Sequence, residues 1–180
     1  KNDLNENKSI GFYEIAKIKF DSDIKDSLKN ILKALDLKKN FPPYVQLHLE
    51  IISKLNDKRN LQKLIKKYWY LSPNSLLRAI VIKILNENDI TDIKIVNEII
   101  KNNPKNEESK KLLIYFAIKN LKWDIARENI AGIIGADPAK DICYLMSDIE
   151  LGENNDKQKS DAWIMRAQNA KLESTWICRI

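Results

Sequence analysis

Glycine and proline are scarce in this chain of 180 residues, which has only four Gly and five Pro. All-β sandwiches and barrels need many tight turns, so this scarcity argues against them. Two cysteines, Cys143 and Cys178, are too few for a disulfide framework, which predicts a reducing compartment. No stretch approaches the roughly 20 apolar residues of a membrane span. Even the apolar run over residues 76–85 is interrupted by Arg78 and Lys83.

Motifs that carry enzyme chemistry are also missing from the sequence. It contains no glycine-rich phosphate-binding motif, no H-E-x-x-H and no G-x-S-x-G. The chain has a single histidine, His48, so a serine or cysteine nucleophile would have only one imidazole base available. We therefore predict a protein that is not an enzyme and that holds no metal and no cofactor.

Apolar residues instead recur with the period of a helix along the whole chain, and they predict an all-α fold. In segment 57–70 they form one stripe behind a capping residue, Asp57. The members of this stripe are Leu61, Leu64, Ile65, Tyr68 and Trp69. Segment 23–37 has a similar stripe made of Ile24, Leu28, Ile31, Leu32 and Leu35.

Prolines divide these helices into pairs. Pro42 and Pro43, Pro73, Pro104 and Pro138 follow one another at gaps of 30–34 residues, and each gap has room for two helices. A helix pair that recurs at about 34 residues and is closed by proline is typical of the tetratricopeptide repeat. The predicted helices are 9–20, 23–37, 43–55, 58–70, 75–87, 91–102, 107–120, 124–134, 140–151 and 157–170.

These helices predict about five antiparallel pairs in a single repeat domain over residues 1–180. The units are expected near 9–42, 43–73, 74–104, 105–138 and 139–172, with a C-terminal tail over 173–180. Because one pair cannot bury its apolar face alone, the pairs are expected to stack into a right-handed superhelix. The first helix of each pair would then line a concave groove.

The fourth unit shows the repeat pattern most clearly. Leu113 and Ala117 are expected on the inner face of its first helix, and Ala126 and Ile130 on that of its second. Small side chains such as that of Ala126 let the two helices approach closely. Trp123 is expected to cover the junction between them.

The net charge of +6 raises the alternative of nucleic-acid binding, since the positive excess lies in residues 1–90. Lys63, Lys66 and Lys67 accompany aromatic residues that could stack on bases. The helical spacing instead places Tyr68 and Trp69 on the buried stripe and the three lysines on a solvated face. No nucleic-acid partner is expected.

Polar residues elsewhere have ordinary structural interpretations. His48 falls on an apolar stripe and is expected to be a hydrogen-bonded core or groove histidine. Cys143 is expected to be buried, and Cys178 to be a terminal thiol. The acidic residues Asp148, Glu150, Glu153 and Asp156 lack the spacing of a calcium loop and are expected to form a solvated turn.

Residues from about 68 to 180 resemble the C-terminal region of the HemY-type tetratricopeptide proteins of alphaproteobacteria. The resemblance rests on three strings: LKWDIARENI, GADPAKDICYLMSDIELGENND and AWIMRAQNAKLESTWIC. It implies a protein anchored in the inner membrane by segments outside this sequence, with this domain in the cytoplasm and a link to haem biosynthesis. In relatives the closing W-x-C string, here Trp176 to Cys178, often continues to a second cysteine.

The leading functional hypothesis is a scaffold that binds a protein or peptide segment in the concave groove. The groove-facing candidates, taken from outward positions of the first helices, are Gln46, Glu50, Lys54, Lys111, Tyr115, Lys119, Tyr144 and Asp148. A paired change of Lys111→Glu with Lys119→Glu is predicted to leave helicity intact while it weakens the capture of a partner. The alternative is a porphyrin or haem carrier, for which His48, Cys143, Cys178 or the tyrosines would supply a ligand.

Overall fold

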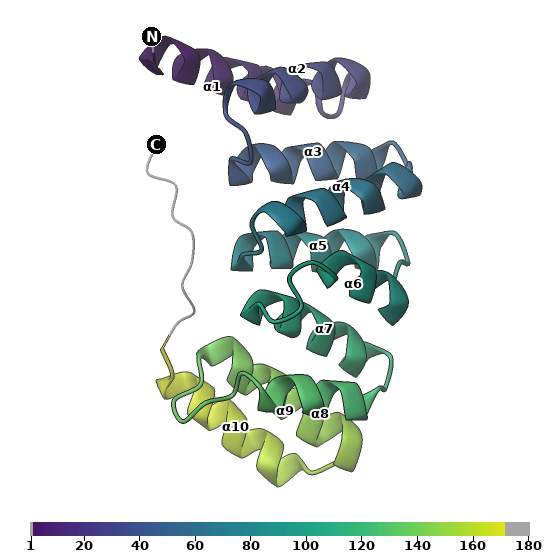
Figure 1. The fold of residues 1–180 in the computed structure, drawn as a ribbon, viewed down its shortest axis with the longest axis vertical. Coiled ribbons are helices and arrows are strands. Elements are labelled where there is room, and N and C mark those ends of the chain that lie inside the picture. The colour runs from purple at the N-terminus through teal and green to yellow at the C-terminus, as the bar shows by residue number, and fades with distance from the viewer. Residues whose placement is uncertain (1, 172–180) are drawn as a thin grey trace. The chain divides into compact units, whose positions relative to one another are not determined.

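The computed structural model describes residues 2–171, and within that range it contains ten helices and no strand. The prediction of an all-α chain of helix pairs is confirmed. The helices, labelled in Figure 1, are α1 (Asn2–Lys19), α2 (Ile24–Leu37), α3 (Pro42–Lys54), α4 (Lys58–Leu71), α5 (Ser75–Glu87), α6 (Ile93–Ile100), α7 (Glu107–Lys119), α8 (Trp123–Ala131), α9 (Lys140–Asn154) and α10 (Lys157–Asn169).

Capping residues fix several of the helix starts. Asp57 accepts a hydrogen bond from the backbone N–H of Asn60, as its position before α4 predicts. Asp23, Asn106 and Asp156 cap α2, α7 and α10 in the same way. Each of these side chains satisfies a backbone donor that the first turn of a helix leaves without a partner.

Several local predictions differ from the structure. Helix α6 is two residues shorter at each end than the predicted 91–102, and α8 ends at Ala131 rather than at residue 134. The first helix begins at Asn2 rather than residue 9, because the polar residues before Ser9 contain no helix breaker. On α2 the buried face includes Ser27 and Ala34, and Leu32 is 43% exposed. The buried face of α2 is therefore rotated relative to the predicted one. The reason is the packing of α2 on α1, where the Ser27 hydroxyl donates to the carbonyl of Ala16 at 2.7 Å.

A further difference concerns α9, which continues through Gly152 to Asn154 and ends at Asn155 in the left-handed conformation. The acidic residues 148–153 therefore lie on a helix, so the predicted solvated turn is wrong for them. Glu150 is only 6% exposed and pairs with Arg127 at 2.7 Å. Asp156 lies beyond the helix end and caps α10.

The helices form two compact units. The first holds residues 2–72 and Ala79–Asn88, and the second holds Pro73–Arg78 and residues 89–171. The first turn of α5 thus belongs to the second unit, and the remainder of this helix belongs to the first unit. The prediction of one repeat domain over 1–180, with the unit boundaries given above, stays a prediction.

Each unit has its own core. In the first unit, Trp69, Leu61 and Ile65 of α4 are fully buried together with Leu49 and Ile51 of α3. In the second unit, an apolar cluster consists of Ile114, Ala117, Ala126, Ile130, Ile142, Met146 and Ile149. Burial of Leu113, Ala117, Ala126 and Ile130 confirms the inner faces predicted for α7 and α8.

A candidate partner-binding surface on the first helices

A cleft in the first unit lies along α3 and α5, the first helices of their pairs. Its volume is about 320 Å³. The residues that line it are Phe20, Glu50, Ser53, Lys54, Lys83, Ile84 and Glu87. Phe20 is half-buried and gives the cleft apolar surface, Ile84 is fully buried, and Lys83 and Glu87 are exposed. Two predicted groove residues, Glu50 and Lys54, therefore line a cleft, and Gln46 is half-buried one turn before Glu50 on α3.

Charged side chains of this cleft pair across elements. The Lys54 ammonium lies 2.6 Å from a carboxylate oxygen of Asp21 and also donates to the carbonyl of Phe20 at 3.1 Å. Glu50 lies 3.5 Å from the Lys83 ammonium and accepts a hydrogen bond from Gln46 at 3.2 Å. The lining of the cleft thus combines the apolar Phe20 with carboxylates and ammonium groups.

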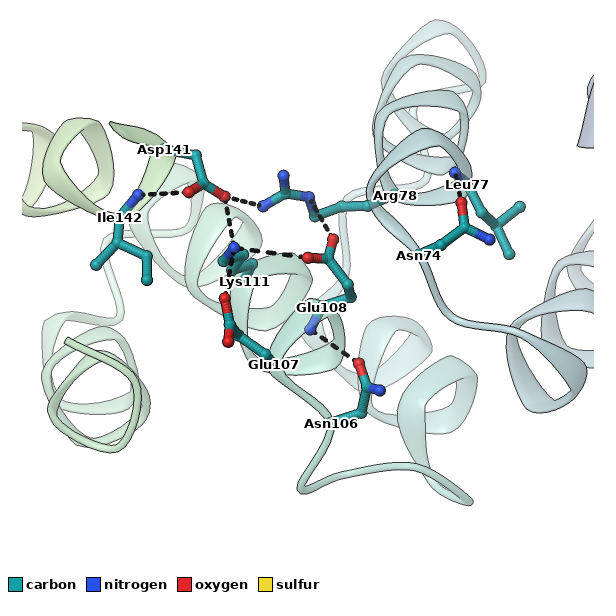
Figure 2. Close-up of polar contacts among 9 residues, drawn as sticks. All are labelled: Asn74, Leu77, Arg78, Asn106, Glu107, Glu108, Lys111, Asp141 and Ile142. Carbon is teal, nitrogen blue, oxygen red and sulfur yellow. Dashed lines mark hydrogen bonds and ion pairs between the residues drawn. The ribbon is translucent and has the colours of Figure 1, made fainter. Parts of the chain in front are cut away.

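A network of ion pairs around the buried Lys111 lies in the second unit (Figure 2). The Lys111 ammonium lies 2.8 Å from Asp141 Oδ2 and 2.7 Å from Glu107 Oε1. Arg78 pairs with the same Asp141 oxygen and with Glu108, each at 3.1 Å. These five residues, which we call the ion-pair network, come from the first turn of α5, from α7 and from α9.

The ion-pair network changes the interpretation of Lys111. Its side chain is only 2% exposed, so the prediction that it points outward is wrong. Burial disfavours the charged form, but hydrogen bonds from the ammonium to Asp141 and Glu107 outweigh this effect and raise the pKa of Lys111. Lys111 therefore stays charged and joins α7 to α9 beneath the surface. The predicted variant with Lys111→Glu would disrupt this core contact and does not test partner binding.

Helical periodicity does not predict the other members of the network. The one signal in the sequence is Arg78, which interrupts an apolar run and there requires an acidic partner. It does not identify Glu108 or Asp141, which lie 30 and 63 residues further along the chain.

The remaining candidates lie on α7 and α9, which pack against each other in the second unit. On α7, Tyr115 is half-buried and Lys119 is exposed. On α9, Tyr144 is 42% exposed and Asp148 is exposed. The network residues Lys111 and Asp141 precede these candidates on the two helices and fix the helices to each other.

His48 is a core residue that bonds to a neighbouring helix. It is 5% exposed, and its Nδ1 lies 2.8 Å from the Tyr68 hydroxyl on α4. Burial, together with the charge of Lys67, lowers the pKa of His48 to about 4, and burial raises the pKa of Tyr68 to about 12. The prediction of a hydrogen-bonded core histidine is confirmed. As placed, His48 offers no surface ligand to a haem.

The burial of the other residues singled out from the sequence can also be compared with the predictions. Cys143 is fully buried, as expected, and burial is the main cause that raises the pKa of its thiol. Tyr68 and Trp69 are buried while Lys63 and Lys67 are exposed, as the helical spacing predicts, whereas Lys66 is half-buried. Cys178, Trp176 and the tail 173–180 lie outside the described residues.

Within residues 2–171 no group of three or more histidine, cysteine or acidic side chains is placed to hold a metal ion. None of the described helices combines the length and the apolar character needed to cross a membrane.

Comparison with known proteins found likeness only among solved structures. No family model and no curated protein matches the chain. The structure “MamA 41-end from Desulfovibrio magneticus RS-1” is 13% identical, with a TM-score of 0.49 over 90% of this chain and 94% of that one. “MamA RS-1 ArsTM double mutant” is 14% identical, with a TM-score of 0.48 over 90% of this chain and 93% of that one. The chain is similar to these two helical structures, and the likeness carries no statement about function.

Proposed function

We propose that this protein is a non-catalytic scaffold that binds a segment of a partner protein on the outward faces of its first helices. The observation that carries the proposal is the cleft along α3 and α5 in the first unit, whose lining combines the apolar Phe20 with charged side chains. Such a mixture suits recognition of a polypeptide, whose side chains and backbone need both apolar contacts and hydrogen-bonding groups.

The shape of the lining also favours a chain segment. Glu50 and Lys54 are four residues apart on α3, and Lys83 and Glu87 are four residues apart on α5. Each pair extends about 6 Å along its helix, given a rise of about 1.5 Å per residue. An elongated occupant lying between these two rows would contact both helices.

A charge exchange at the rim tests this proposal. Lys83→Glu combined with Glu87→Lys keeps the net charge and alters only exposed side chains, so the fold should persist. The matched control is Lys29→Glu with Asp36→Lys on α2, where both residues are also exposed. Each chain would serve as bait in chemical crosslinking from native extract, followed by mass spectrometry.

We expect a specific protein to be captured by the wild type and by the α2 control, and to be lost with the Lys83/Glu87 exchange. Equal capture by all three baits would reject the cleft as the binding site. A wild-type bait that captures nothing above background would reject the scaffold function itself.

The lineage and location inferred from sequence resemblance belong to the same proposal. A HemY-type relationship, a link to haem biosynthesis, and an inner-membrane protein with this domain in the cytoplasm rest on the three quoted strings alone. Cell fractionation with an antibody against this domain tests the location. Recovery in the soluble fraction of the source cells would contradict it.

A further inference from the structure

Three side chains on α9 form an exposed row that the fold does not use. Tyr144, Asp148 and Leu151 occupy positions i, i+4 and i+7, which lie on one face of a helix. All three are exposed, with Tyr144 at 42% and Leu151 at 46%. An aromatic and an aliphatic side chain therefore lie one turn to either side of a carboxylate. We call these three residues the α9 row.

Asp148 differs from the other acidic residues of its helix. Asp141 is held by Lys111 and Arg78, and Glu150 and Glu153 are both held by Arg127. Asp148 has no hydrogen bond or ion pair with any residue that the structure describes. Neighbouring groups also partly dehydrate its carboxyl and raise its pKa. A carboxylate that loses water without gaining a partner is stabilised by an incoming cation.

The surroundings of Tyr144 contain one positive group already. The Lys140 ammonium lies 5.9 Å from the centre of the Tyr144 ring. Lys140 precedes Tyr144 by one turn, whereas Asp148 follows it by one turn. An incoming cation is therefore favoured on the side of Asp148, with the tyrosine ring and Leu151 available for the apolar carbons of its side chain.

We propose that the α9 row binds a partner segment that presents a lysine or arginine to Asp148, with apolar side chains before and after it that pack on Tyr144 and Leu151. The inference rests on the proposed scaffold function and names the chemistry of its partner. The row extends over about 10 Å of helix, which matches a short stretch of polypeptide better than an isolated ammonium ion.

A displayed library of random 12-residue peptides, selected against the whole chain, tests this inference. We expect enrichment of peptides with a lysine or arginine between apolar or aromatic residues. The affinity of an enriched peptide would then be measured by fluorescence polarisation against the wild type, Asp148→Asn and Asp161→Asn. Asp161 is an exposed aspartate of α10 and serves as the matched control.

Because Asp148→Asn removes a charge-assisted contact, we expect it to weaken peptide binding about tenfold or more. The control Asp161→Asn should change the affinity by less than about twofold. Tyr144→Ala should also weaken binding. Enriched peptides without a basic residue, or peptides that bind Asp148→Asn as tightly as the wild type, would overturn the inference.

The same peptides separate this inference from the proposed function. Peptides that lose affinity with the Lys83/Glu87 exchange but not with Asp148→Asn would reject the α9 row and leave the scaffold in place. A selection that enriches no peptide would count against both.

Discussion

At the scale of single residues, the buried state of His48 couples its protonation to stability. Its pKa is lowered from 6.5 to about 4 in the folded chain, so the unfolded chain binds a proton first as the pH falls. Stability is therefore lost as the pH falls from about 6.5 to about 4, by about 3 kcal/mol from this residue. We expect His48→Asn to lose less unfolding free energy than the wild type between pH 7 and pH 4.5, as measured by urea unfolding.

Tyr68→Phe provides the comparison for this experiment. It removes the hydroxyl that lies 2.8 Å from His48 Nδ1 and should cost about 1–3 kcal/mol. Because burial is the main cause of the lowered pKa of His48, the pH dependence should persist in this variant. If the unfolding free energies of the wild type and His48→Asn depended on pH in the same way, the lowered pKa of His48 would be contradicted.

Lys111 gives a second prediction at this scale. Lys111→Glu would bring a further carboxylate next to Glu107, Glu108 and Asp141, so we expect a loss of more than about 3 kcal/mol of unfolding free energy. Lys111→Met should cost less, since it keeps the buried stem and leaves Asp141 paired with Arg78. Urea unfolding followed by circular dichroism would measure both. Equal stability of the wild type and Lys111→Glu would contradict the ion-pair network.

The same residue marks a limit of prediction from sequence. Spacing placed Lys111 in one row with Tyr115 and Lys119 on α7, and all three belong to that helix. Periodicity identifies which residues share a helix face, but it does not say where a neighbouring helix covers that face. Asp141, 30 residues further on, covers the start of the row, and its contact depends on tertiary packing.

At the scale of helices, two glycines in helical positions provide a matched experiment. A side chain at Gly11 of α1 would meet nothing within 4 Å, so Gly11→Ala should stabilise the chain by about 0.5–1 kcal/mol through helix propensity. A methyl group at Gly152 of α9 would collide with the ring of Trp123. We expect Gly152→Ala to destabilise the chain despite the same gain in propensity.

Thermal unfolding of the two glycine variants beside the wild type measures these effects. Stabilisation by both substitutions would show that the Trp123 ring moves aside at little cost. The Trp123→Leu background should relieve the collision, so that Gly152→Ala becomes neutral or stabilising there.

Most helices were predictable because their determinants are local. Asp57 before α4 and the proline between α4 and α5 act on neighbouring backbone, and the observed bounds of these helices differ from the predicted ones by at most one residue. The start of α1 was missed because its polar first turns show no apolar period. The rotation of α2 was missed because Ser27, a polar residue, packs against α1.

At the scale of the whole chain, the helix pairs divide into two compact units, and the sequence did not predict this division. The proline spacing continues through Pro73 at the start of the second unit without a change. No long linker separates the units, because α5 belongs to both. The division arises from long-range packing, to which the local repeat pattern is insensitive.

Two fragments that overlap in α5, residues 1–88 and 73–180, test whether each unit folds on its own. Because each retains the core residues and the part of α5 that its unit uses, we expect helical circular dichroism and cooperative urea unfolding from both. Arg78→Ala should cost the fragment 73–180 about 3 kcal/mol, because Glu108 and Asp141 lose a buried partner. The same substitution should cost the fragment 1–88 less, since it contains neither carboxylate. Equal losses of unfolding free energy in the two fragments would show that Arg78 acts through α5 itself. A fragment that unfolds without cooperativity would show that its unit depends on the other unit for folding.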